Sequence, residues 1–522
     1  MAGSTLFIIA ATLGSTILGF GREVINARIY GTQYQMDAFL AAATIPTILF
    51  GVFNGALVSA LVPTFAGYLA HDDEDGAWRL GNTIVNLLAI VLVLCAIGGW
   101  FLAPYYVPVV ARGFGAEQMQ MTIAMTRILM PSVIAVSLSG VVSAMLNAYR
   151  RFRATALTGI AVNVVTIGTV LWLNGRDGIY ALAYGTAAGL VAQLIVQLPA
   201  FLAIRRYRLQ VDLAHPGLKH MWLLLGPIVV GSAAGQVALF FDRFFASTLT
   251  PGYISGMNYA VKLTNLPQAV FAAAIATVIF PLIAAQFARE NRAGVGRSVT
   301  VGLRLVNFIT IPSTVALIVL ARPIVQTLFE RGSFRSTATD LCAGLLPYAA
   351  VGLVALASNV VLTRCAFACR EMAWTVGISV FAVVVNVLLS LVWLPTLEAR
   401  GLLLANAVSQ ALQAALLFAL VWRLVGGLEW RPLAISTVKI LAASAVMFAA
   451  LHWIDALNAH PEATLLSRGW FLFGQLAIAA LTFLAASYAL RVEELPMAWH
   501  TIRAKFERNL ISPPETRDAP IA

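Results

Sequence analysis

Charged side chains are scarce in this sequence. Lys, Arg, Asp and Glu together make up 11% of its 522 residues, less than half of the roughly 25% found in soluble domains. So few charges cannot cover the surface of a soluble protein of this length, and apolar residues account for 60% of the chain. The same composition excludes an intrinsically disordered chain. An integral membrane protein is the class that remains.

Motifs for soluble enzyme chemistry are also lacking. The sequence contains no GxxxxGK[ST] loop, no HExxH and no CxxC, and its four cysteines lie in apolar stretches away from paired histidines. No connection between apolar runs is long enough to hold an ATPase domain. We therefore expect neither an enzyme nor a bound metal or cofactor. A monovalent cation gradient, the membrane potential or downhill flux would have to drive any transport.

Long apolar runs are what the sequence has in abundance. A spanning helix needs about 20 mostly apolar residues, and fourteen runs qualify as candidates, which predicts an all-α polytopic membrane protein. The runs cover residues 4–21, 38–69, 83–107, 122–148, 154–174, 179–204, 220–247, 257–287, 298–321, 341–367, 374–396, 401–424, 433–454 and 467–490. Lys and Arg are more frequent in the connections after even-numbered runs, so both termini are expected in the cytoplasm.

The sequence repeats itself at an interval of about 220 residues. Arg22 precedes Pro46 by 24 residues, and Arg243 precedes Pro267 by 24 residues. Further pairs at nearly the same offset are Asp37 with Asn258, Pro63 with Pro281, and Asn163 with Asn386. Each repeat holds six helices, and since six is an even number, both repeats enter the membrane in the same direction. Such repeats are related by an axis along the membrane normal.

This repeat predicts the domain organisation. Residues 1–210 would form an N-terminal lobe of helices 1–6, and residues 211–427 a C-terminal lobe of helices 7–12. Two lobes with a cavity between them are typical of a transporter. The remaining two helices, in 428–492, lie outside the repeat, and 493–522 would be a cytoplasmic tail.

Several charges fall where the membrane should be. A charge at the centre of a span costs about 2.5–3.5 kcal/mol, so one that is kept there usually faces a cavity and has a role. Those in the first two helices of each repeat are Arg22, Glu23, Arg28, Asp37, Asp242, Arg243 and Lys262. The four cations suit an anionic substrate, because arginine can bind pyrophosphate oxygens through two bonds. The alternative is that the arginines reach out to lipid headgroups.

Two further groups of residues have two interpretations each. Asp37, Asp242 and Glu23 are either counter-ions that hold the cations in place or sites for a coupling cation or proton. Pro46, Pro63, Pro267 and Pro281 fall inside helices 2 and 8, where proline bends a helix. Matched bends in both repeats suit hinges for rocking between inward-open and outward-open states, while ordinary packing kinks are the alternative.

Several stretches carry a resemblance to a known family. They are STILGFGREVINARIYGTQYQMDAFLAAATIP, NGALVSALVPTF, LNAYRRFRATALTGIAVNVV, DRFFAS, YAVKLTNLPQAVF, IFPLIAAQFA and TLFERGSF. In order and spacing the chain resembles the MurJ (MviN) family of lipid II flippases, within the multidrug/oligosaccharidyl-lipid/polysaccharide (MOP) exporter superfamily. The resemblance spans helices 1 to 12.

The resemblance implies a function and several roles. Members move undecaprenyl-pyrophosphate-linked peptidoglycan precursor from the cytoplasmic to the periplasmic leaflet of the bacterial inner membrane, which would make this a cell wall biogenesis protein with a lipid-linked saccharide as substrate. The resemblance also implies membrane lipids and the cell-wall or polysaccharide synthesis machinery as partners. It does not imply nucleic acid as a partner. Arg22, Arg28, Asp37 and Lys262 match family positions that meet the pyrophosphate, and helices 13 and 14 would form a groove for the lipid tail.

The chain also departs from the family pattern. Thr16 stands where well-studied members carry arginine, Asn54 where they carry glutamate, and Asn265 where an acidic residue is common; all three are expected to line the cavity. Fewer cavity charges favour an alternative substrate, an exopolysaccharide or O-antigen unit on the same lipid carrier. An ion-coupled exporter of organic cations would prefer an acidic cavity, and a non-transporting scaffold would not need matched cations in both repeats.

Overall fold

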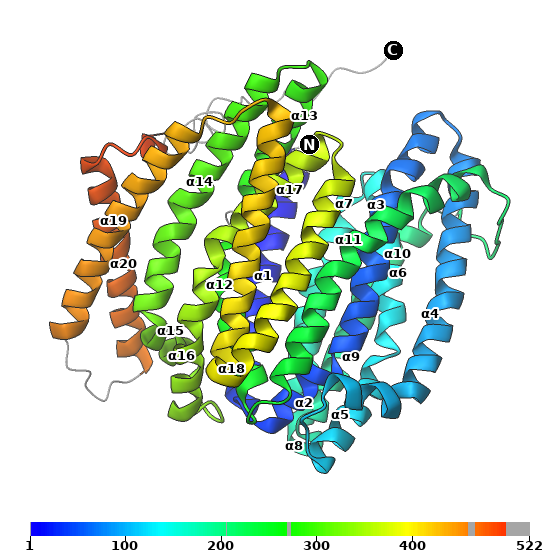
Figure 1. The fold of residues 1–522 in the computed structure, drawn as a ribbon. Coiled ribbons are helices and arrows are strands. Elements are labelled where there is room, and N and C mark those ends of the chain that lie inside the picture. The colour runs from blue at the N-terminus through cyan, green and yellow to red at the C-terminus, as the bar shows by residue number, and fades with distance from the viewer. Residues whose placement is uncertain (1, 205, 269–272, 458–464, 497–522) are drawn as a thin grey trace. The chain divides into compact units, whose positions relative to one another are not determined.

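The computed structural model describes all residues except 1, 205, 269–272, 458–464 and 497–522 (Figure 1). In this part the chain forms helices joined by short connections, and no β-strand. The first ten helices are α1 Ala2–Tyr30, α2 Tyr34–Ala42, α3 Thr44–Ala70, α4 Glu74–Val110, α5 Ala116–Leu129, α6 Ser132–Ala148, α7 Phe152–Ala156, α8 Thr158–Asp177, α9 Tyr180–Ile195 and α10 Leu198–Leu202. The others are α11 Pro216–Ala246, α12 Tyr253–Pro267, α13 Ala273–Ala288, α14 Arg292–Val319, α15 Ala321–Phe329, α16 Ser336–Val351, α17 Leu353–Ala368, α18 Met372–Val425, α19 Trp430–Leu457 and α20 Leu465–Ala489.

The helices confirm a polytopic all-α membrane protein. Within the described residues, nine are long and apolar enough to cross a membrane, or ten if the bent pair α16 and α17 forms one span. The expected number of fourteen spans is therefore not confirmed. Several expected single helices are instead two segments, for example α5 and α6, which meet at Met130 and Pro131. Proline has no backbone N–H and disfavours continuation of the preceding helix, which accounts for that break.

The first helix is longer than the apolar run predicts. We expected it to end at residue 21, but α1 continues through Arg22 and Arg28 to Tyr30 and stops at Gly31, whose φ is 59°. Arginine and glutamate are good helix formers, so polarity alone does not end the helix. A glycine that adopts the left-handed conformation does. Arg22 and Glu23 therefore lie inside α1 and not at its end.

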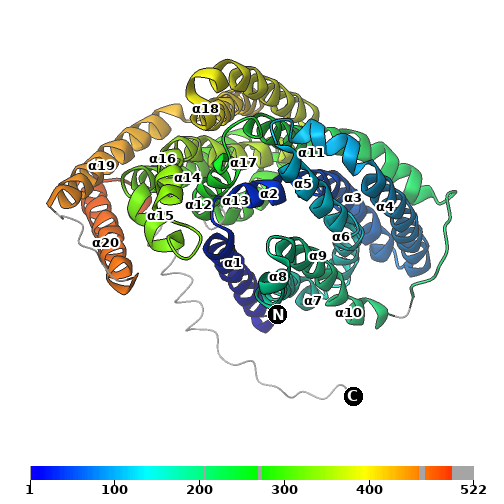
Figure 2. The same cartoon turned by 90° about the horizontal axis from the view of Figure 1, so that it is seen from below.

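The chain divides into two compact units. The first contains Met1–Leu263, Val325–Gly352 and Glu371–Gln413, and the second contains Thr264–Ile324, Leu353–Arg370 and Ala414–Ala522. In the first unit, α1 packs against α8, and α8 packs against α9 (Figure 2). Aromatic side chains of α3 and α4 form part of its core, where Phe65 meets Trp78 with ring centroids 6.3 Å apart. In the second unit, α19 packs between α14 and α20.

The internal repeat appears in the local geometry of helix ends. Asp73 Oδ1 accepts a hydrogen bond from Gly76 N at 2.8 Å, and 218 residues later Asn291 Oδ1 accepts one from Gly294 N at 2.9 Å. Left-handed backbone conformations recur in the same way, in Gly31 and Gly252, Asp72 and Glu290, Arg150 and Arg370, and Gly178 and Glu398. The same positions thus start and stop helices in both halves of the sequence.

Candidate functional site

Three of the expected charges lie together where α1 meets α12. Glu23 Oε1 is 3.2 Å from Arg22 Nη2 and 3.6 Å from Lys262 Nζ. The carboxylate is the most buried of the three, because its side chain is 11% exposed, against 24% for Arg22 and 44% for Lys262. The group carries a net charge of +1. Since a guanidinium has five N–H donors and an ammonium three, both cations keep donors that a further anion can use.

Asp37 fixes the start of the helix that carries Lys262. This carboxylate is 2% exposed, and it accepts hydrogen bonds from the backbone N–H groups of Gly252 at 2.5 Å and Ser255 at 2.8 Å. Such bonds satisfy the free N–H groups at a helix N-terminus, and the negative charge is favourable at that end of the helix dipole. Lys262 follows Ser255 by seven residues, or two helical turns, on the same face. The cap therefore sets the direction in which the Lys262 helix leaves.

Arg243 and Asp242 have other partners. Arg243 donates to the carbonyl of Ile254 at 3.5 Å and to Asn258 Oδ1 at 3.4 Å. These two bonds join α11 to the first turns of α12. Asn258 is the repeat counterpart of Asp37. Asp242 lies near Asn386. Within the described part of the chain, neither charge forms an ion pair with Glu23, Arg22 or Lys262.

The remaining expected residues are dispersed. The Arg28 side chain is exposed, and its backbone carbonyl accepts from Ser333 N at 2.8 Å. Thr16 is exposed and donates to the carbonyl of Thr12 at 2.9 Å. Asn265 is partly buried. The side chain of Asn54 lies outside the described part of the structure, so its expected place in the cavity stays a prediction.

The four prolines differ in their surroundings. Pro46 is buried in the first turn of α3, and Pro63 lies inside the same helix with its side chain exposed. Pro267 is the last residue of α12. Pro281 belongs to α13, and its side chain lies outside what the structure describes. Their expected role as hinges stays a prediction.

One contact at this end of α1 was not expected. The loop after α15 packs against the end of α1, where Ser333 N donates to the Arg28 carbonyl at 2.8 Å. Tyr259 of α12 donates to the Gly31 carbonyl at 3.4 Å in the same place. Tyr259 is fully buried, and its ring centroid lies 5.2 Å from that of Phe329 and 5.6 Å from that of Phe334. The signal in the sequence was the TLFERGSF stretch, which holds both phenylalanines. It indicated family likeness but no contact partner.

Comparison with solved structures shows which known proteins share this fold. It shares its fold with a solved lipid II flippase MurJ in an inward closed conformation, with a TM-score of 0.79 at 22% identity over 93% of this chain and 99% of that one. An inward-facing multidrug resistance MATE family transporter of the MOP superfamily matches with a TM-score of 0.71 at 15% identity, over 81% of this chain and 98% of that one. The chain thus has the fold that these two transporters share.

Sequence comparison identifies the family. The model of the family "Lipid II flippase MurJ" matches residues 26–467. A probable lipid II flippase MurJ of Rhizobium meliloti (strain 1021) is 30% identical over 94% of both chains, and the lipid II flippase MurJ of Burkholderia cenocepacia is 28% identical over 78% of this chain and 81% of its own. The chain belongs to the MurJ family of lipid II flippases. It is a multi-pass protein of the bacterial inner membrane and a transporter, not an enzyme.

Proposed function

We propose that this protein moves lipid II from the cytoplasmic to the periplasmic leaflet by alternating access, and that Arg22 and Lys262 bind its pyrophosphate. The observation that carries the proposal is the group of Arg22, Glu23 and Lys262, in which two cations share one carboxylate. A pyrophosphate brings more negative charge and more acceptor oxygens than Glu23 supplies. It would therefore replace Glu23 as the main partner of both cations.

Asp37 acts in this scheme as a structural cap. Its two backbone hydrogen bonds to the start of α12 favour the counter-ion interpretation over that of a coupling site. Arg243, with its bonds to Ile254 and Asn258, supports α12 from the side of α11. Arg28, Asp242, Asn54, Asn265 and Thr16 remain candidates for contact with the rest of the substrate.

The wider architecture of the proposal follows the repeat. Residues 1–210 and 211–427 form two lobes that rock about the kinks at Pro46, Pro63, Pro267 and Pro281. Residues 428–492, with α19 and α20, provide the groove for the polyprenyl tail. Both termini lie in the cytoplasm, as the distribution of Lys and Arg favours, and either a monovalent cation gradient or the membrane potential drives the cycle.

Growth complementation tests the proposed substrate. Cells depleted of their own lipid II flippase should grow when they express this chain, and should not grow when they express R22A/K262A at the same level in the membrane. The matched control is R289A/R292A, which removes two exposed cations elsewhere and should restore growth. Failure of the inserted wild-type chain to restore growth would overturn lipid II as the substrate and favour the exopolysaccharide or O-antigen alternative.

A further inference from the structure

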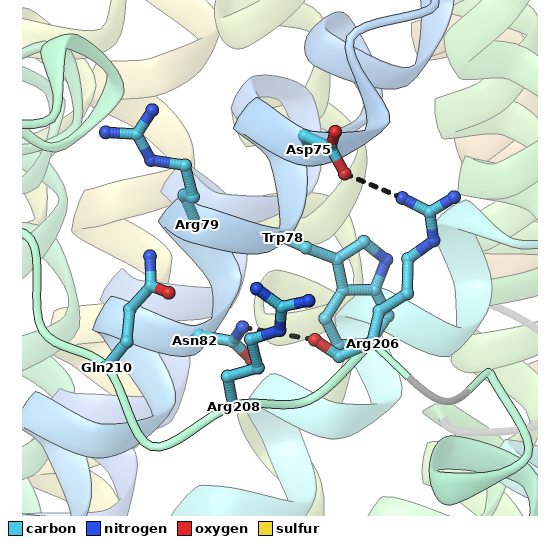
Figure 3. Close-up of a pocket in the computed structure, with 7 residues that line it drawn as sticks. All are labelled: Asp75, Trp78, Arg79, Asn82, Arg206, Arg208 and Gln210. Carbon is cyan, nitrogen blue, oxygen red and sulfur yellow. Dashed lines mark hydrogen bonds and ion pairs between the residues drawn. The ribbon is translucent and has the colours of Figure 1, made fainter.

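A polar pocket lies at the start of α4, apart from the group of Arg22, Glu23 and Lys262. Its volume is about 640 Å³, and it lies between the first turns of α4 and the link that joins α10 to α11 (Figure 3). The lining residues are Asp75, Trp78, Arg79, Asn82, Arg206, Arg208 and Gln210. Three arginines thus line one cavity, and nothing in the proposed transport cycle uses them.

The charges around the pocket are balanced but not fully paired. Arg79 pairs with Asp212 at 2.8 Å, and Arg206 pairs with Glu74 at 2.5 Å and with Asp75 at 2.9 Å. Among the described residues the Arg208 guanidinium has no acidic partner. Asp75 uses one oxygen for Arg206, and its side chain is 93% exposed. The pocket therefore offers one cation and one carboxylate oxygen to a ligand while its six charged groups sum to zero.

Backbone contacts hold the link against α4. Asn86 Nδ2 donates to the carbonyls of Arg208 at 3.1 Å and Gln210 at 2.9 Å, and its Oδ1 accepts from the Tyr207 hydroxyl at 2.7 Å. Asn82 Nδ2 donates to the Arg206 carbonyl at 3.3 Å (Figure 3). The backbone that carries Arg206 and Arg208 is thus anchored to α4 at several points. An anchored backbone lowers the ordering cost of binding.

An apolar strip begins one turn beyond Asn86 on the same face of α4. At 100° per residue, Ile90, Val93, Ile97 and Phe101 lie within about 40° of Arg79 around the helix. Their exposed fractions are 54%, 40%, 51% and 64%. Helix α4 has 37 residues, or about 55 Å, so it extends beyond the hydrocarbon core of about 30 Å. Its first turns thus reach the headgroup layer, and the strip below them faces acyl chains.

We propose that this pocket binds an aminophospholipid, a glycerophospholipid whose headgroup holds a phosphodiester and a primary ammonium. Arg208 binds the phosphate, and the free oxygen of Asp75 accepts from the ammonium. The acyl chains lie along the strip from Ile90 to Phe101. Because the six charged groups sum to zero, a zwitterionic headgroup leaves the occupied pocket neutral, whereas an anionic headgroup leaves it with a net negative charge.

Lipid binding to the purified full-length protein tests this proposal. The delipidated protein in detergent would be titrated, by native mass spectrometry, with phosphatidylethanolamine, phosphatidylcholine and phosphatidylglycerol that have identical acyl chains. We expect phosphatidylethanolamine to bind about tenfold more tightly than phosphatidylcholine, whose trimethylated nitrogen cannot donate to Asp75. It should also bind more tightly than phosphatidylglycerol. Equal binding of the three lipids, or tightest binding of phosphatidylglycerol, would overturn the proposal.

Variants locate the site and identify the part of the lipid that binds. R208Q should weaken the binding of all three lipids about tenfold. D75A, which removes the acceptor oxygen, should abolish the preference for phosphatidylethanolamine over phosphatidylcholine. The control is R297Q, because Arg297 is the exposed counterpart of Arg79 in the second repeat; it should bind all three as the wild type does. Unchanged binding by R208Q would contradict the assignment of the pocket. Water-soluble glycerophosphoethanolamine should not compete at the concentration of the lipid, and equal competition would overturn the role of the strip.

Discussion

Replacing Asp37 by alanine should loosen the first turn of α12 specifically. The substitution leaves two buried N–H groups, those of Gly252 and Ser255, without a partner. Each unsatisfied group costs about 1–3 kcal/mol, and the helix loses a favourable charge at its N-terminus. We therefore expect local opening to become easier by about 3 kcal/mol, which is more than a hundredfold at 1.4 kcal/mol per factor of ten. D37N keeps one acceptor oxygen and should lose about half of that free energy.

Amide hydrogen exchange measures this effect, because exchange of a protected N–H reports the free energy of local opening. Exchange of the Gly252 and Ser255 amides should accelerate in the order wild type, D37N, D37A. The matched control is D73A, which removes an exposed carboxylate cap from α4. It should accelerate exchange at Gly76 and leave the start of α12 unchanged. Wild-type exchange at Gly252 and Ser255 in D37A would refute the inference that this carboxylate holds the helix.

Three further predictions concern stability, which thermal unfolding in detergent measures. R304Q should destabilise the second unit by about 3–5 kcal/mol, because Arg304 binds the fully buried Glu494. E493Q should cost less than about 1 kcal/mol, since the Glu493 side chain is 67% exposed. Similar losses of stability for both variants would contradict this prediction. The hydrogen bond from Arg304 lowers the pKa of Glu493. The pair therefore stabilises the fold at pH values above the ordinary pKa range of glutamate. The difference in stability between the wild type and E493Q should vanish as the pH falls through the lowered pKa. G332A should cost more than about 2 kcal/mol, because Gly332 has a φ of 58° and a Cβ there would lie 2.4 Å from the Arg28 carbonyl oxygen. G344A is the control, since Gly344 lies in α16 with open space around it. This substitution should stabilise the protein by about 0.5–1 kcal/mol. Equal effects of G332A and G344A would count against the packing of the loop after α15 on α1.

The sequence predicted the helical class, because that class depends on local composition. Apolar runs indicated a multi-pass protein, although their number is not confirmed, and the cost of an intramembrane charge gave seven candidates, of which Arg22, Glu23 and Lys262 lie together. It could not predict that Glu23 pairs with Lys262, because that depends on how α1 and α12 cross after a separation of more than 200 residues.

The role of Asp37 was beyond the sequence for another reason. Its partners are backbone N–H groups, which every residue except proline carries, so no side-chain pattern identifies them. The length of α1 was mispredicted because its end is set by the backbone conformation of Gly31 and not by polarity. The two halves nonetheless repeat their helix caps at matched positions, which the constant offset between repeats had indicated.

A leaflet-transfer assay tests the central claim most directly. Purified protein in vesicles that contain labelled lipid II would be assayed for the rate at which the label reaches the opposite leaflet. The wild type and R289A/R292A should transfer lipid II at similar rates. R22A/K262A should lose at least about a hundredfold, because each charge-assisted contact to the pyrophosphate is worth about 1.5–3 kcal/mol. Transfer by R22A/K262A at the wild-type rate would contradict pyrophosphate binding at this site.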